Sequence, residues 1–268
     1  MGLILYKEKI ANYLNHDQKT EELGFDNTRL SYIPEYFSSY VEQERIPNFV
    51  CLVSRFGEVA HYSHQGFKNT ESKEEINNET IFRIYSMTKP ITSVAIMMLY
   101  ERGLIRLEHE LYRYLPEFKN TEVWETGDIN NFKTKPLNNP ILIRDLLTHT
   151  AGFTYDFMLG HPAIGLYRKN GLHDYKNIET QEEMDLEEFC NKLSRLPLLF
   201  DPGEKWHYSC SIDILGRVVE VVSGMKLDAF FRENIFNPLE MLDTGFNVEK
   251  DKLDRFSDCY QTMLGSKK

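Results

Sequence analysis

Residues 82–103, FRIYSMTKPITSVAIMMLYERG, place a reactive motif at the beginning of a helix. Their apolar members recur at the spacing of one buried helical face, at Ile91, Val94, Ala95, Met98 and Leu99. Gly103 ends the pattern. Pro90 has no N–H and is tolerated only in the first helical turn, so the helix must begin within a residue or two of Ser86.

Residues 86–89 form a Ser-x-x-Lys motif. Residues three apart share a helical face, and the free N–H groups of a helix N-terminus can stabilise an alkoxide or an oxyanion. A second Ser-x-x-Lys begins at Ser223, but it follows the apolar helix predicted over 212–222, whose terminal carbonyls would repel that charge. We therefore predict Ser86 as the nucleophile and Lys89 as its partner. The alternative is that Ser86 only caps the helix.

Tyr208 is the candidate third member of the group. It stands in DPGEKWHYSCSIDILG, residues 201–216, on a loop that leads into a helix. A phenol and an ammonium have similar intrinsic pKa values, and such a pair can share one proton. The residues leave open which of Lys89 and Tyr208 is the base, and position alone would also fit an ordinary half-buried tyrosine.

The order of predicted elements indicates an α+β fold. Two β-rich runs, residues 48–54 and 57–64, form a hairpin. Further helices are expected over 141–147, 186–193, 212–222 and 227–235, with long loops at 120–140 and 160–170. We predict a helix or arm at 1–30 and one domain at 31–268, in which 31–85 supply the sheet part and 86–246 a mainly helical lobe.

Composition limits the partners. With 268 residues, of which 41% are hydrophobic, the chain can bury a large core. A net charge of -10 would repel nucleic acids and anionic membranes. No run is long enough to span a membrane, so a cytoplasmic protein is expected, or an exported one if a signal segment has been removed. The four cysteines and eight histidines show no metal-ligand spacing, and we predict neither metal nor cofactor.

Four blocks resemble the serine β-lactamase and penicillin-binding protein family, including its class C enzymes, D-amino-acid peptidases and family VIII esterases. They are residues 82–103, IRDLLTHTAGF at 143–153, 200–224 and IFNPLEMLDTGF at 235–246. The resemblance implies an antiparallel sheet flanked by helices, a helical lobe, and an acyl-enzyme formed on Ser86 with Lys89 and Tyr208 moving protons. It also implies that His149 packs rather than catalyses. Tyr85 is a candidate substrate-binding residue.

Two departures from the family pattern bear on substrate and completeness. Lactamases of this type have asparagine two residues after the tyrosine, whereas this chain has Cys210, a second candidate substrate-binding residue whose presence favours esters. Family members also continue to a Lys-Thr-Gly or His-x-Gly strand, and the His-x-Gly here, at residues 64–66, precedes the nucleophile and is interpreted as a strand end or turn. We expect a C-terminally truncated chain with an unpaired sheet edge, at which self-association would occur.

The predicted function is a serine hydrolase that acts through an acyl-enzyme on a small ester or amide. An esterase is favoured. The first alternative is a β-lactamase or D-alanyl-D-alanine peptidase proper. The alternative from another class is a catalytically inactive relative that serves as a binding or assembly protein.

Overall fold

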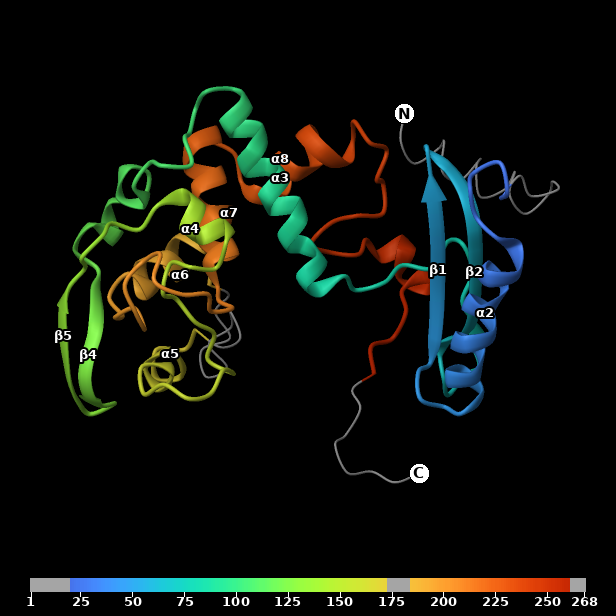
Figure 1. Ribbon diagram of the computed structural model, residues 1–268, viewed down its shortest axis with the longest axis horizontal. Helices are drawn as coiled ribbons and strands as arrows, with labels where there is room; N and C mark the ends of the chain where they lie inside the picture. The colour runs from blue at the N-terminus through green and yellow to red at the C-terminus, as the bar shows by residue number, and fades with distance from the viewer. Residues whose placement is uncertain (1–19, 173–183, 261–268) are drawn as a thin grey trace. The chain divides into compact units, whose positions relative to one another are not determined.

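A computed structural model describes residues 20–172 and 184–260, which fall into two units (Figure 1). The first unit comprises residues 1–85 and 234–268, and the second comprises residues 86–233. The chain thus passes from the first unit to the second between Tyr85 and Ser86 and returns after Glu233. Residues 1–19 of the predicted N-terminal arm lie outside the described residues, and its last residues belong to a helix.

The first unit contains a helix packed on a small sheet. Helix α2 (Asn27–Glu42) contacts strands β1 (Asn48–Arg55) and β2 (Glu58–Asn69) (Figure 1). The ring centroids of Phe37 and Phe49 lie 5.2 Å apart. Asp26 caps the helix by accepting from the Arg29 N–H at 3.0 Å. No helix was predicted over residues 31–42, because Pro34 lies inside this segment and none of its residues is buried.

The predicted hairpin is confirmed. Strands β1 and β2 pair antiparallel up to Arg55 and Glu58, and the two turn residues, Phe56 and Gly57, both have positive φ, as a tight hairpin requires. A short strand β3 (Glu74–Glu75) completes the order β1-β2-β3. Within the described residues, the other edge of β1 therefore has no neighbouring strand.

The interpretation of residues 64–66 as a strand end or turn is wrong, because they lie inside β2. Gly66 pairs with Asn48 and has a φ of 103°. A Cβ at this position would meet the Pro47 carbonyl oxygen at 2.3 Å. Glycine is therefore required here by the close approach of two backbones in the hairpin.

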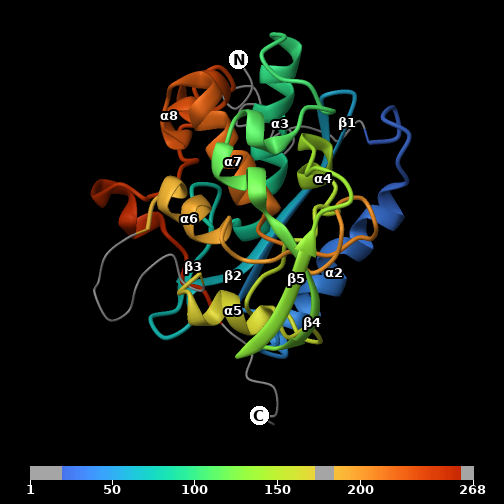
Figure 2. The ribbon, with the colours of Figure 1, turned by 90° about the vertical axis from the view of Figure 1, so that its left-hand side faces the viewer.

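Most of the regular secondary structure of the second unit is helical (Figure 2). Helix α3 (Thr88–Glu101) follows a 3-10 turn (Tyr85–Met87) and packs on α7 (Ser211–Ser223) and α8 (Leu227–Phe231). The predicted helix start beside Ser86 is confirmed, but the predicted buried face is only partly right. Ile96 is fully buried whereas Val94 is 49% exposed, because α7 and α8 cover one side of α3.

The remaining predicted helices are present. Helix α4 (Ile143–Leu147) and helix α6 (Leu186–Leu193) both contact α7, and a π-helical turn (Arg232–Phe236) continues α8. Shorter 3-10 segments occupy Leu111–Arg113, Pro116–Asn120 and Lys250–Arg255. Within the described part of the chain, no helix has the length and apolar character needed to cross a membrane.

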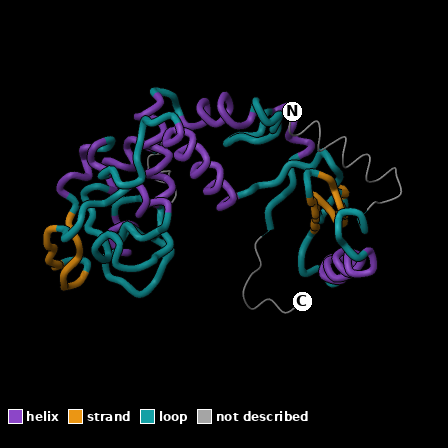
Figure 3. Tube along the Cα trace, turned by 45° about the horizontal axis from the view of Figure 1, so that its top comes forward, coloured by secondary structure: helices purple, strands orange, loops and turns teal. Residues whose placement is uncertain are grey.

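The two predicted loops contain regular structure instead. Residues 120–140 hold a second hairpin, β4 (Glu122–Asp128) with β5 (Asn131–Pro136), drawn in orange at one end of the helical unit in Figure 3. Trp124 and Phe132 stack across it at 4.8 Å between ring centroids. Residues 160–170 hold helix α5 (Ile164–Lys169). The hairpin was missed because most of its residues are exposed, and α5 was missed because it is only 6 residues long.

Candidate active site

Ser86 lies in the 3-10 turn that leads into α3, and it is exposed to solvent. The preceding residue, Tyr85, has a φ of 41°, a left-handed conformation that is uncommon outside glycine. Such strain persists only where the surrounding structure enforces it, and it is frequent at functional sites. The sharp turn at Tyr85 brings the chain into α3 at Ser86, at the positive end of the helix.

Three predicted residues meet at this point. The Ser86 hydroxyl lies 2.8 Å from the Tyr208 hydroxyl, and the Lys89 ammonium donates to Ser86 Oγ at 3.3 Å. Lys89 Nζ also lies 4.8 Å from the centroid of the Tyr208 ring. A hydroxyl, an amine and a phenol therefore touch within the second unit, although Tyr208 is 122 residues away from Ser86 in the sequence.

The loop that carries Tyr208 is held by the segment after α4. The His207 N–H donates to the His149 carbonyl at 2.9 Å, and the Gly203 N–H donates to the Thr150 carbonyl at 2.9 Å. His207 Nε2 is also 2.8 Å from the Thr154 hydroxyl. These contacts hold the loop on the N-terminal side of Tyr208, so that the phenol reaches Ser86 from a defined direction.

The charges around Tyr208 favour proton transfer. Burial raises the pKa of the Tyr208 phenol. The hydrogen bonds to Lys89 and Ser86, together with the positive charge of Lys89, outweigh this effect, so the pKa of Tyr208 lies below its usual value. A phenol with a lowered pKa gives up its proton more readily near neutral pH. The arrangement can therefore take a proton from a serine hydroxyl and return it to a leaving group.

His149 packs beside the phenol. Its ring centroid lies 5.0 Å from that of Tyr208, and its Nδ1 is 3.2 Å from the Ser209 hydroxyl. Burial, together with the charge of Lys89, lowers the pKa of His149, so the imidazole is neutral at neutral pH. These contacts agree with the packing position that the family resemblance implies.

Tyr155 was missed by the sequence reasoning. Its ring lies 5.3 Å from the Tyr208 ring and 5.6 Å from Lys89 Nζ, and its hydroxyl is 3.4 Å from Asp213 Oδ2. Burial and then the carboxylate of Asp213 raise the pKa of Tyr155, so this second phenol stays protonated. Only its position two residues after the family-like block at 143–153 could have drawn attention to it.

Two further residues were predicted to bind substrate, Tyr85 and Cys210. Tyr85 belongs to the first unit, where its hydroxyl lies 3.2 Å from Cys259 Sγ. Cys210 is 2% exposed and lines a small cavity of about 100 Å³, which Tyr155 also lines. Their predicted contact with substrate stays a prediction. Ser223, the rejected alternative, ends α7 and donates to the Val219 carbonyl at 2.6 Å.

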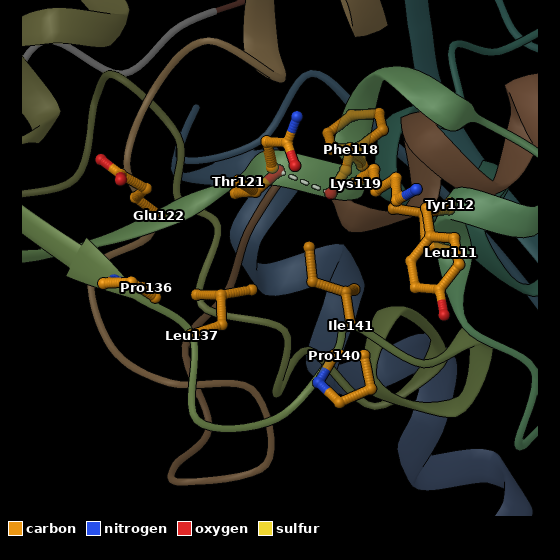
Figure 4. Close-up of a pocket in the computed structure, with 11 residues that line it drawn as sticks. Leu111, Tyr112, Phe118, Lys119, Thr121, Glu122, Pro136, Leu137, Pro140 and Ile141 are labelled. Carbon is orange, nitrogen blue, oxygen red and sulfur yellow. Dashed lines mark hydrogen bonds between the residues drawn. The ribbon is translucent and has the colours of Figure 1, made fainter.

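A separate pocket of about 370 Å³ opens near the β4–β5 hairpin (Figure 4). Leu111, Phe118 and Ile141 form its apolar side, and neither the nucleophile nor its partners line it. Its walls carry no serine, histidine or cysteine. In residues 20–172 and 184–260, no three His, Cys, Asp or Glu side chains gather as metal ligands.

Comparison with known proteins identifies the family. The sequence profile of the Beta-lactamase family matches residues 33–266. Esterase EstB from Burkholderia gladioli is 34% identical over 210 residues, covering 78% of this chain and 50% of the esterase. Monacolin J acid methylbutanoyltransferase from Aspergillus terreus is 29% identical over 233 residues, covering 83% of this chain and 53% of that enzyme.

A solved structure gives the same result for the fold. EstCE1, described as a hydrolase with promiscuous acyltransferase activity, superposes with a TM-score of 0.74 and 29% identity, covering 91% of this chain and 58% of that chain. The chain spans about half the length of the curated relatives it matches. The predicted resemblance and fold class are confirmed: this chain belongs to the Beta-lactamase family.

Proposed function

We propose that the protein is a serine hydrolase that cleaves small esters through an acyl-enzyme, with Ser86 as nucleophile and Lys89 and Tyr208 as the proton-transfer group. The observation that carries the proposal is the contact of the three groups, 2.8 Å from Ser86 to Tyr208 and 3.3 Å from Ser86 to Lys89. A nucleophile and its base must lie within hydrogen-bond reach, and such contacts are often looser before substrate binds.

The chemistry follows from these positions. Ser86 Oγ attacks the ester carbonyl carbon while its proton passes to the Lys89–Tyr208 pair. The N-terminal end of α3 stabilises the oxyanion that forms on the carbonyl oxygen. The pair then returns the proton to the departing alkoxide, and the acyl group remains on Ser86. Water repeats the sequence in the second half, releasing the acid and restoring the serine.

Acyl transfer is a second candidate function. Relatives named as a methylbutanoyltransferase and as a hydrolase with promiscuous acyltransferase activity support it. Both reactions share the acyl-enzyme on Ser86 and differ only in whether water or another alcohol attacks it. Added alcohol acceptors that accelerate p-nitrophenolate release and accumulate as new esters would identify transfer.

Covalent labelling of Ser86 tests the proposal without requiring turnover. Incubation of the full chain with a fluorophosphonate is expected to add one phosphonyl group, which intact mass and peptide mapping locate at Ser86. Ser86→Ala is expected to prevent the adduct. Ser223→Ala is the matched control. Ser223 also begins a Ser-x-x-Lys motif, but it ends α7, where its hydroxyl donates a hydrogen bond to the Val219 carbonyl. An unlabelled wild-type protein would point to the inactive alternative.

The substrate class is tested with two chromogenic substrates. A p-nitrophenyl ester of a short acid is expected to give a Ser86-dependent burst of nitrophenolate, followed by slower turnover. A chromogenic cephalosporin is expected to be opened far more slowly, because Cys210 replaces the asparagine that lactamases of this type have. Faster opening of the cephalosporin would favour the lactamase alternative.

A further inference from the structure

Five aromatic side chains form one continuous row through the candidate active site. The ring centroids are 6.4 Å apart from Trp206 to His149, 5.0 Å from His149 to Tyr208, 5.3 Å from Tyr208 to Tyr155, and 4.9 Å from Tyr155 to Phe157. The rings come from two loops, residues 149–157 after α4 and residues 206–208 before α7. Tyr208, which touches Ser86, is the middle member of the row.

The two ends of the row are exposed. Trp206 is 65% exposed and Phe157 is 58% exposed, whereas the rings between them are half-buried. Large apolar side chains that are exposed singly need no explanation, but contiguous exposed apolar surface usually marks a binding site. Here Trp206 lies next to the phenol that contacts the nucleophile, and Phe157 is connected to that phenol through Tyr155.

Lys89 fixes which side of the row faces the reaction. Its ammonium lies 4.8 Å from the centroid of the Tyr208 ring and 5.6 Å from that of Tyr155, and it also donates to Ser86 Oγ. The nucleophilic oxygen therefore stands beside the row at its centre. A carbonyl carbon bonded to Ser86 Oγ would therefore lie within a few bond lengths of the row.

We propose that this aromatic row, Trp206, His149, Tyr208, Tyr155 and Phe157, is the wall that binds the organic groups of the ester, and that it selects esters with apolar or aromatic groups. The inference rests on the proposed esterase function. An ester has an acyl group on one side of the reacting carbonyl and an alcohol group on the other. The row likewise offers two separate exposed rings, Trp206 at 6.5 Å from the Tyr208 ring and Phe157 next to Tyr155, so each of them takes one of these groups.

The effect expected from each end is about tenfold in selectivity. A ring that buries roughly 60 Å² of apolar ligand surface contributes about 1.5 kcal/mol, which corresponds to about a tenfold change in kcat/KM. Such a contribution appears in the comparison of large with small substrates, because a small group does not reach the end of the row. The readout is therefore a ratio of two kcat/KM values.

Two substrate series measure these ratios for the wild-type protein, Trp206→Ala and Phe157→Ala. The acyl series compares p-nitrophenyl octanoate with p-nitrophenyl acetate, and the alcohol series compares phenyl acetate with ethyl acetate by acid release. We expect the wild type to prefer the larger ester in both series. Each variant is expected to lower one of the two ratios about tenfold. Trp206→Phe, which keeps a ring, is expected to preserve most of the preference.

The controls separate this inference from the proposed function. Phe56→Ala removes a ring that is 79% exposed on the hairpin of the first unit, and both ratios are expected to stay at the wild-type values. Absence of phosphonyl labelling and of acetate hydrolysis in the wild type would overturn the proposed function itself. Normal labelling with both ratios unchanged in Trp206→Ala and Phe157→Ala would overturn only the role of the row.

Discussion

Replacement of Tyr208 by phenylalanine tests the proposed chemistry most directly. Ser86 Oγ has two partners, the Tyr208 hydroxyl at 2.8 Å and the Lys89 ammonium at 3.3 Å, and the variant keeps only the longer contact. A positioned proton-transfer group contributes about 10²–10⁴-fold to rate. We therefore expect the acylation rate, measured as the burst of p-nitrophenolate in stopped flow, to fall at least about a hundredfold.

The same substitution should hardly change stability. The hydroxyl of Tyr208 bonds to an exposed serine that water can reach, so its loss is expected to change the free energy of unfolding by about 1 kcal/mol or less. Tyr36→Phe is the matched control, because it removes a phenol bonded to the Tyr40 hydroxyl at 2.9 Å outside the site. A Tyr208→Phe protein that acylates within about threefold of wild type would refute the proposed role.

Three further perturbations have defined outcomes. The charge of Asp213 raises the pKa of Tyr208, so Asp213→Asn is expected to lower that pKa further and move the acidic limb of the kcat/KM profile to lower pH. The Arg255 guanidinium, which donates to Asp243 Oδ2 at 2.5 Å, and to a lesser degree Lys252 lower the pKa of Asp243 to about 2. Asp243→Asn should therefore lower the free energy of unfolding by roughly 1 kcal/mol at pH 7 after allowance for solvent screening. Gly66→Ala should destabilise the protein by at least about 2 kcal/mol.

Each of these outcomes has a measurement that can contradict it. An acidic limb of the kcat/KM profile that moves to higher pH or stays in place in Asp213→Asn would contradict the first expectation. The stability that Asp243 contributes is present above its unfolded pKa of 3.8 and is lost as pH falls toward 2, so urea unfolding of Asp243→Asn and wild type should converge at that pH. Gly103→Ala, where no atom lies within 4 Å of the new Cβ, should cost less than Gly66→Ala.

The part of the site that could be predicted from sequence is the local part. Ser86 and Lys89 are three residues apart at the start of a helix, so helical geometry alone brings them together. The helix itself was predictable because Pro90 restricts where it begins and the apolar spacing shows that it continues. The exact buried face was not predictable, because it depends on how α7 and α8 pack against α3.

The remainder of the site depends on contacts between distant segments. Tyr208 reaches Ser86 because backbone bonds to His149 and Thr150 hold its loop, and no local pattern encodes those bonds. Tyr155 lies in a loop without helical or strand periodicity, so its place against Tyr208 follows only from tertiary packing. Position alone made Tyr208 a candidate, and the family resemblance supported it, since a resemblance transfers a residue by its motif rather than by its geometry.

The aromatic rings link substrate preference to the chemistry itself. A lysine side chain loses about 2 kcal/mol of rotamer entropy when it is held in one position. The rings of Tyr208 and Tyr155 offset part of that cost, because an ammonium over an aromatic face gains about 0.5–2 kcal/mol. The two rings that hold Lys89 beside Ser86 are also the centre of the proposed substrate wall. A change at Tyr155 is therefore expected to alter both the rate of acylation and the preference among esters, whereas changes at Trp206 and Phe157, which do not contact the ammonium, act on preference first.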